Sequence, residues 1–345
     1  MLRQMILLLV PTFIFLGCQT TPPTPQAPPC GVEIRAAFDV GSGSTKMKVA
    51  ELNTCTNKIV SVLAEEQVKV DYRDALDKSK DDLFPPATME SGMKALEKLK
   101  GKAIKKGAKK FTGVATAAFR QAKNSEEFVK NVREKLGIPL QVISQNLEGL
   151  IGFQAASQQT RKDPAQLLMW DIGGGSQQMV ILNDSNQPVI YLGQLASVSF
   201  KNQVIEKVQK KNIKKVNSPN PLKKSDVEKA VEIAKAEAKD TVPADIKNKI
   251  AQKPAVSIVG IGGVLSKSVL RQLTPNPNVT QEQLKKALDK RTGMTDKQIK
   301  DPFSATEVTN LALVYGYMKA LNIKSYKPID VNLVDGLWFQ PEIWQ

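Results

Sequence analysis

The chain has 345 residues, enough for two domains with separate hydrophobic cores. It contains no histidine, which excludes a Ser-His-Asp triad, a Cys-His pair and any His-ligated zinc site. The formal net charge of +15 favours polyanionic partners such as polyphosphate, nucleic acid, anionic lipid or cell-wall polymers. Because aromatic residues are sparse and do not interleave with the basic runs, nucleic acid is not expected as a partner.

The first segment, residues 1–17, has the features of a lipoprotein signal peptide. Arg3 precedes the apolar run Met5–Leu16, which is too short to span a membrane. The small residue Gly17 then precedes Cys18, a pattern that resembles a bacterial lipobox. We therefore expect cleavage before Cys18 and a lipid on its thiol. The alternative is ordinary secretion with a free Cys18.

Residues 18–31 are rich in proline and predict a tether without a fold of its own. The expected location is the bacterial cell envelope, with the chain anchored by lipid on the periplasmic side. Gln19 after the lipidated cysteine favours the outer membrane over the inner one.

A β-hairpin follows the tether. Ile34–Val40 and Thr45–Leu52 have strand patterns and flank a glycine and serine turn. Paired positions in a hairpin have a constant sum, which is about 86 for a turn centred in this stretch. Cys30 and Cys55 sum to 85 and should face each other at the open end. A disulfide between them is predicted, as is usual outside the cytosol.

The remaining elements of the first half alternate between strands and helices. We expect strands at 58–70, 111–115 and 140–144, and helices at 88–107, from Asn124 or Ser125 onward, and at 149–159.

The second half of the chain repeats the hairpin pattern of the first. Leu167–Trp170 and Gln178–Leu182 form a second predicted hairpin, and its Asp171 lies 132 residues after Asp39 in the first. This repeat indicates two duplicated half-domains. A strand at 255–260 leads into a third glycine turn and a helix from Val264. Further helices are expected at 201–215, 225–239, 280–289 and 304–321.

The glycine turns are the candidate ligand-binding elements of the chain. Successive N–H groups in such a turn form a concave anion site. An aspartate beside it cannot bind phosphate directly, but it can hold a divalent cation that does. Taken alone, Asp171–Ser176 could equally be a hairpin turn whose aspartate caps backbone N–H groups.

Together, five motifs in order resemble the exopolyphosphatase/guanosine pentaphosphate phosphatase family of the actin-like ATPase superfamily. In chain order they are the first phosphate loop, Asp39–Ser44; an Ala-Thr segment with an arginine, Ala115–Asn124; a strand followed by a glutamate, Val142–Gly149; the second phosphate loop, Asp171–Ser176; and the third glycine turn, Val259–Gly263.

The resemblance implies an α/β fold of two ribonuclease-H-like domains with a cleft between them. Residues 32–145 would form domain I and residues 146–322 domain II. Residues 323–345 would form a C-terminal segment that packs back on domain I. The resemblance leaves a homodimer open.

The resemblance also implies Mg²⁺-dependent removal of a terminal phosphate from polyphosphate. Glu148 would be the general base, and Asp39 and Asp171 would hold Mg²⁺ or another divalent cation. The phosphate-binding set would be Ser42, Gly43, Ser44, Arg120, Gly173, Gly174, Gly175, Ser176, Gly262 and Gly263. Alternatively, Arg120 pairs with Glu126, and Glu148 is only an early helical acid.

Three positions depart from the family pattern. Gly43 replaces the usual Asn, and Gln177 and Gln178 replace the usual Thr-Glu after Ser176. The site therefore has fewer carboxylates than is usual for the family. Two functions follow: a lipid-anchored phosphohydrolase that uses Asp39, Glu148 and Asp171 alone, or a lipoprotein of the same fold that binds polyanions without turnover.

Overall fold

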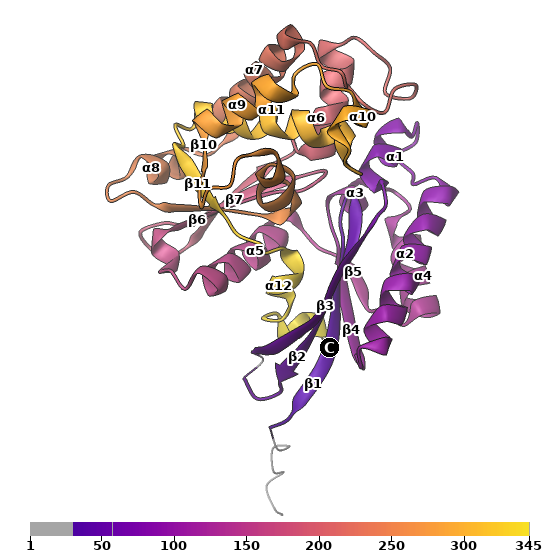
Figure 1. The fold of residues 1–345 in the computed structure, drawn as a ribbon. Coiled ribbons are helices and arrows are strands. Elements are labelled where there is room, and N and C mark those ends of the chain that lie inside the picture. Colours follow the sequence, from indigo (N-terminus) through magenta and orange to yellow (C-terminus); the bar gives the residue numbers. More distant parts are fainter. Residues whose placement is uncertain (1–29, 57, 345) are drawn as a thin grey trace, which may run out of the picture.

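The chain is described by a computed structural model that covers residues 30–56 and 58–344 and contains two β-sheets (Figure 1). The first sheet contains β1 (Val32–Val40), β2 (Ser44–Asn53), β3 (Ile59–Lys69), β4 (Lys110–Ala115) and β5 (Leu140–Val142). The second contains β6 (Leu167–Ile172), β7 (Gln177–Leu182), β8 (Pro188–Gly193), β9 (Ser257–Ile261), β10 (Val279–Thr280) and β11 (Ser325–Pro328). The segment with residues 1–17 and Cys18 lies outside the described residues.

Both sheets have the same topology. The first has the order β3-β2-β1-β4-β5, with the first three strands antiparallel and the last two parallel to β1. In the second, β8, β7, β6, β9 and β11 repeat this arrangement, and β10 is added at the edge. The expected fold of two ribonuclease-H-like domains is therefore confirmed, and we call the halves built on the two sheets domains I and II.

Helices cover one face of each sheet with an apolar core between them. Domain I has α1 (Tyr72–Lys78), α2 (Pro86–Lys105), α3 (Ala117–Gln121) and α4 (Ser125–Leu136). Domain II has η1 (Pro164–Gln166), α6 (Ser197–Gln203), η2 (Val204–Val208), α7 (Lys224–Thr241), α8 (Ala244–Ala251), η3 (Val264–Ser268), η4 (Leu270–Gln272), α9 (Gln281–Arg291), α10 (Asp296–Ile299) and α11 (Ser304–Ala320). None of the helices in the described part of the chain is long and apolar enough to cross a membrane.

The opposite sheet faces are covered by helices that cross between the domains. α5 (Gln145–Thr160) follows the last strand of domain I and packs on the second sheet. α12 (Leu333–Leu337) and η5 (Pro341–Trp344) follow β11 and pack on the first sheet. α5 and α12 also touch each other, because a Cβ at Gly336 would lie 2.4 Å from Ile151. This exchange fixes α5 between the two domains.

The C-terminal segment differs from its predicted role in one respect. Only α12 and η5 pack on domain I, whereas β11 of the same segment belongs to the sheet of domain II. The reason is that Tyr326 on β11 is buried and its ring meets that of Trp170 edge-on. The apolar side chains of β11 thus complete the core of the second domain.

Three helix boundaries also differ. α5 begins at Gln145 instead of Gly149, because the Ser144 hydroxyl accepts a hydrogen bond from the N–H of Leu147 and caps the helix. The helix predicted over 201–215 ends in a π-helical turn at Val208, and Lys210, whose φ is +57°, is no longer helical. The helix predicted from Val264 is a π-helical turn of five residues.

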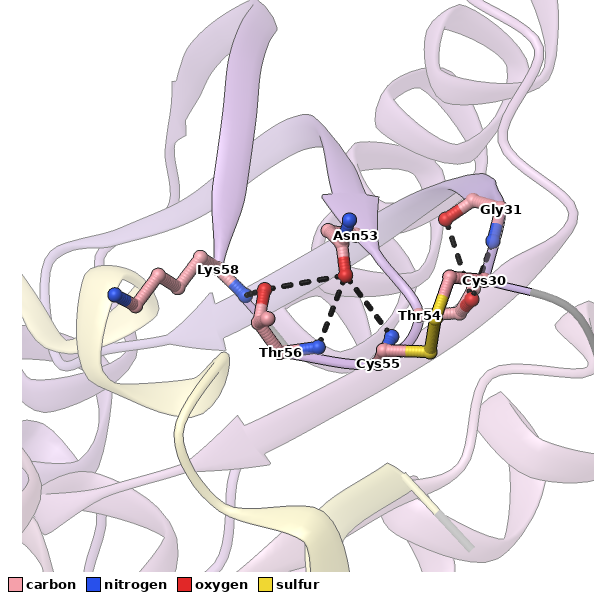
Figure 2. The surroundings of a disulfide bond; sticks show 7 residues. All are labelled: Cys30, Gly31, Asn53, Thr54, Cys55, Thr56 and Lys58. Carbon is pink, nitrogen blue, oxygen red and sulfur yellow. Dashed lines mark hydrogen bonds between the residues drawn. A yellow bond between two sulfur atoms is a disulfide. The ribbon is translucent and has the colours of Figure 1, made fainter. Parts of the chain in front are cut away.

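Cys30 and Cys55 form a disulfide at the open end of the first hairpin (Figure 2). The β1–β2 pairs, such as Val32 with Asn53, all sum to 85, so the register itself places the two cysteines opposite each other. The side-chain oxygen of Asn53 accepts hydrogen bonds from the N–H groups of Cys55 and Thr56 and orders the turn that follows.

Loss of this disulfide should lower the free energy of unfolding by about 3 kcal/mol, since it closes a loop of 25 residues. The measurement is chemical denaturation of the oxidised chain and of a Cys30→Ser/Cys55→Ser variant, whose stability should not respond to reductant. Equal stability of the two proteins would contradict the prediction.

Candidate active site

The two Asp-Gly turns have the same backbone geometry. The N–H of Gly41 donates to the carbonyl of Ser44 at 3.0 Å, and the N–H of Gly173 donates to that of Ser176 at 2.9 Å. Each turn joins two antiparallel strands and follows the carboxyl end of the first, β1 or β6. The repeat seen in the sequence is therefore a repeat of structure.

The two turns face each other and touch. A Cβ at Gly174 would lie 2.9 Å from Cβ of Ser42, and one at Gly175 would lie 2.7 Å from its Oγ. Glycine is required at both positions for this close approach. Among the described residues, the N–H groups of Gly174 and Gly175 have no hydrogen-bond partner, so they are free to meet an anion.

A cavity of about 350 Å³ lies where the turns meet. Its wall contains five carboxylates, and three of them are the predicted acids Asp39, Glu148 and Asp171; the others are Asp71 and Asp74. It also contains all the predicted phosphate-binding residues except one: Ser42, Gly43, Ser44, Gly173, Gly174, Gly175, Ser176, Gly262 and Gly263. The fold thus gathers residues from distant parts of the chain around one space.

Arg120 is the exception, since it lies behind the cavity wall. Its Nη1 donates to Oε2 of Glu148 at 2.8 Å and to the carbonyl of Ile143 at 3.1 Å, and its Nη2 donates to Oγ of Ser176 at 3.2 Å. The alternative pairing with Glu126 is wrong. The guanidinium holds Glu148 and the second turn in place, which differs from the expected clamp on phosphate.

Glu148 is a buried acid in the first turn of α5. The pKa of Glu148 is raised to about 7, because burial, the largest cause, and the neighbouring Asp171 and Asp39 together raise it by more than the Arg120 guanidinium lowers it. A carboxyl with this pKa exchanges protons near neutral pH, as a general base must. The interpretation of Glu148 as an ordinary helical acid does not account for its place in the cavity wall.

Asp171 ends β6 and lies against the third glycine turn. The pKa of Asp171 is raised to about 6, because burial, the largest cause, and Asp39 together raise it by more than Lys46 lowers it. A Cβ at Gly262, where φ is +75°, would come within 2.1 Å of Oδ1 of Asp171. Gly262 therefore leaves room for this carboxylate.

The third turn differs from the predicted phosphate site. The N–H of Gly262 donates to the carbonyl of Val331 at 2.9 Å, so it is not available to phosphate. The π-helical turn that follows is also too short to supply the N-terminus of a full helix. Gly262 acts through its small size, and Gly263 lines the cavity beside it.

Lys46 is a cavity residue that the sequence motifs did not single out. Its Nζ lies 3.2 Å from Oδ2 of Asp39, and it lines the cavity. Burial lowers its pKa, but Asp39, Asp171 and Glu148 together raise it above the ordinary value. The hairpin register would have identified Lys46, because positions 39 and 46 sum to 85 and Lys46 therefore pairs with Asp39 across the hairpin.

The two glutamines after Ser176 have different surroundings. Gln177 is buried and structural: its oxygen accepts from the indole N–H of Trp170 at 3.1 Å, and its amide donates to the carbonyl of Leu195. Gln178 donates to Oγ of Ser176 at 3.2 Å. The amide of Gln178 thus orients Ser176 at the position where a family glutamate would add a charge.

Asp39 and Asp171 fit a divalent cation. Oδ1 of Asp39 is buried and has no hydrogen-bond partner in the described structure. No group of three or more His, Cys, Asp or Glu side chains within residues 30–56 and 58–344 has the arrangement of a metal site made by protein alone. Mg²⁺ does not need one, since it binds through one or two carboxylates together with waters and substrate phosphates.

The duplicated domains and the paired Asp-Gly turns over one cavity define a phosphate-handling protein of the actin-like ATPase class. The Ppx/GppA phosphatase family matches residues 48–310, and the chain belongs to that family.

Solved structures of the family have the same fold. The Ppx/GppA family member of Aquifex aeolicus is 18% identical, with a TM-score of 0.66 over 90% of this chain and 98% of that one. An exopolyphosphatase from Cytophaga hutchinsonii is 13% identical, with a TM-score of 0.70 over 90% of this chain and 97% of that one. Family membership supports a phosphohydrolase.

Proposed function

We propose that the chain is an exopolyphosphatase-like phosphohydrolase, which removes the terminal phosphate of polyphosphate with the help of Mg²⁺ or another divalent cation. The observation that carries the proposal is Glu148 in the cavity wall, with a pKa of about 7 and its carboxylate held by Arg120. Ionised Glu148 orients a water molecule and accepts its proton as the water oxygen attacks the terminal phosphorus. The bridging P–O bond to the rest of the chain breaks, so that orthophosphate and a polyphosphate shorter by one unit are released.

The rest of the cavity suits phosphoryl transfer, which depends on positioning and charge neutralisation. The N–H groups of Gly174 and Gly175 and the hydroxyls of Ser42 and Ser176 donate to phosphate oxygens. Lys46 adds a fixed positive charge. A divalent cation held by Asp39 and Asp171 would supply further charge neutralisation when bound.

A second candidate is a polyanion-binding protein of the same fold without turnover. Two observations favour it: Lys46 already occupies Oδ2 of Asp39, and Gln178 stands where the family has a carboxylate. Both reduce the negative charge available to a cation.

We also propose that the protein resides in the bacterial envelope with a lipid on Cys18, on the periplasmic side and at the outer membrane in preference to the inner one. The sequence of residues 1–18 supports this, and so does the disulfide, which is typical of oxidising compartments. Mass spectrometry of the mature N-terminus tests it: a diacylated Cys18 is expected, and an intact residue 1 would contradict it.

The test of function is orthophosphate release from long-chain polyphosphate, measured with Mg²⁺ and with a chelator. Release that depends on Mg²⁺ is expected. If no phosphate is released while polyphosphate still binds at moderate salt, the second candidate is correct. If the protein neither releases phosphate nor binds the polymer, both are wrong.

Arg120→Gln should move the pH–rate profile upward. The guanidinium lowers the pKa of Glu148, so its loss raises the pH at which Glu148 ionises, by about one unit or more. Activity requires ionised Glu148 and should therefore reach half its maximum at a higher pH. The pH dependence of kcat/KM measures this.

Arg120→Lys is the matched variant, because it keeps the positive charge and should keep the midpoint closer to that of the wild type. A midpoint that stays unchanged in Arg120→Gln, or moves down, would contradict the role given to Arg120.

A further inference from the structure

The end of domain I farthest from the active site is the end where the chain enters. β1 begins at Val32, two residues after Cys30, and carries the first phosphate turn at its other end. β4 runs parallel to β1, so its start lies at the same end, where the N–H of Lys109 donates to the carbonyl of Ile34 at 3.1 Å. Figure 1 shows this end at the bottom of domain I, next to the C-terminus.

This end carries a cluster of exposed lysines. Lys105 ends α2, Lys106 is the next residue, and Lys109 precedes β4. In the described part of the chain none of the three lies within ion-pair distance of a carboxylate, whereas the neighbouring Lys110 is held by Glu33 at 3.2 Å. The helix dipole accounts for a cation at Lys105, but not for Lys109 beyond the helix.

Exposed apolar side chains lie at the same end of domain I as these lysines. Ile104 is 54% exposed on the last turn of α2, and Val32 is 59% exposed at the start of β1. Cations next to exposed aliphatic side chains are the combination that binds the interface of an anionic bilayer. We call Val32, Ile104, Lys105, Lys106 and Lys109 the basic end.

We propose that the basic end docks on an anionic phospholipid bilayer. The position of the tether supports this occupant over other polyanions, and in this respect the proposal rests on the lipidated Cys18 proposed above. Eleven residues lie between the lipid-bearing position and Cys30. They span at most about 40 Å, so the basic end is the part of the described chain that the anchor holds nearest the membrane.

Docking in this way has a consequence for the active site. β1 has nine residues, so the first phosphate turn lies about 30 Å from Val32 and roughly 20 Å from Lys109, which is level with Ile34. The field of an anionic membrane decays with a Debye length of about 8 Å at physiological salt. The cavity is therefore far enough from the lipid charges that they do not repel a polyanionic substrate.

The test uses the full-length chain with Ile104→Cys, labelled with a polarity-sensitive fluorophore. The matched variant is Lys229→Cys on α7 of domain II, and the unsubstituted chain treated with the same dye corrects for any label on Cys18. The probes are vesicles of equal amounts of phosphatidylcholine and phosphatidylglycerol, and vesicles of phosphatidylcholine alone. A blue shift is expected at position 104 with the anionic vesicles only, and none at position 229.

Charge removal sharpens the result. In the chain labelled at position 104, a triple variant replaces three lysines of the basic end with glutamine: Lys105, Lys106 and Lys109. It should raise the concentration of anionic vesicles needed for a half-maximal blue shift by roughly 100-fold, about fivefold per lysine. A second triple variant replaces three lysines of α7 with glutamine: Lys224, Lys229 and Lys239. It removes the same amount of charge from another surface and should leave the vesicle concentration for the half-maximal shift unchanged.

Three outcomes would overturn the proposal: no shift at position 104, an equal shift at both positions, or an equal effect of the two triple variants. A shift with polyphosphate but not with vesicles would assign the basic end to the polymer and also overturn it. Orthophosphate release in solution does not involve vesicles, so its result stands separately from this one.

Discussion

Glu148→Gln should lower kcat on polyphosphate by roughly 10²- to 10⁴-fold, the usual contribution of a general base. The amide has nearly the shape of the carboxylate, and its oxygen can still accept the hydrogen bond from Nη1 of Arg120. The substitution therefore removes proton acceptance while the cavity keeps its form. Steady-state orthophosphate release measures the loss, and polyphosphate affinity should change little.

Glu126→Gln is the matched control. Glu126 is also in the first turn of a helix, but it is exposed and lies outside the cavity wall. Its substitution should leave kcat unchanged. Equal activity of Glu148→Gln and the wild type would remove Glu148 from the mechanism.

Gly262→Ala should weaken divalent-cation binding by roughly 10- to 100-fold, as loss of a residue that supports a metal ligand usually does. The new Cβ would lie 2.1 Å from Oδ1 of Asp171 and force that carboxylate to move. The positive φ of +75° adds backbone strain of about 1–3 kcal/mol, which should appear as a lower free energy of unfolding. Calorimetric titration with Mn²⁺ and chemical denaturation measure the two effects.

The neighbouring Gly263→Ala is the control. Its Cβ would meet nothing within 4 Å, and its φ of −66° suits alanine. Both cation affinity and stability should match the wild type. If the two variants behave alike, Gly262 does not shape the site of Asp171.

The hairpins and the glycine turns were predictable because their signals are local. Alternation of apolar and polar residues marks β1 and β2, and the constant sum of paired positions places Cys30 opposite Cys55. The offset between Asp39 and Asp171 indicated a duplicated domain, and the sheet orders confirm it. Each of these inferences needs only residues close in the chain, or a repeat of them.

The partners of Arg120 were not predictable, because they come from separate elements. Ile143, Glu148 and Ser176 meet the guanidinium only once α3, α5 and the second turn have packed together. The resemblance implied that the C-terminal segment packs on domain I and that the helix after Glu148 belongs to domain II, and α12 and α5 do so. The contact between these two helices was not predictable, since it depends on which sheet face each helix covers. Lys46 is different, because the hairpin register that predicted the disulfide also pairs it with Asp39.

The removal of terminal phosphates is the central claim, and ³¹P nuclear magnetic resonance of long-chain polyphosphate with Mg²⁺ tests it most directly. We expect the orthophosphate resonance to grow while the end-group resonance stays nearly constant, because cleavage at a terminus creates no new chain end. Growth of the end-group resonance without orthophosphate, or a spectrum that does not change with time, would contradict the account.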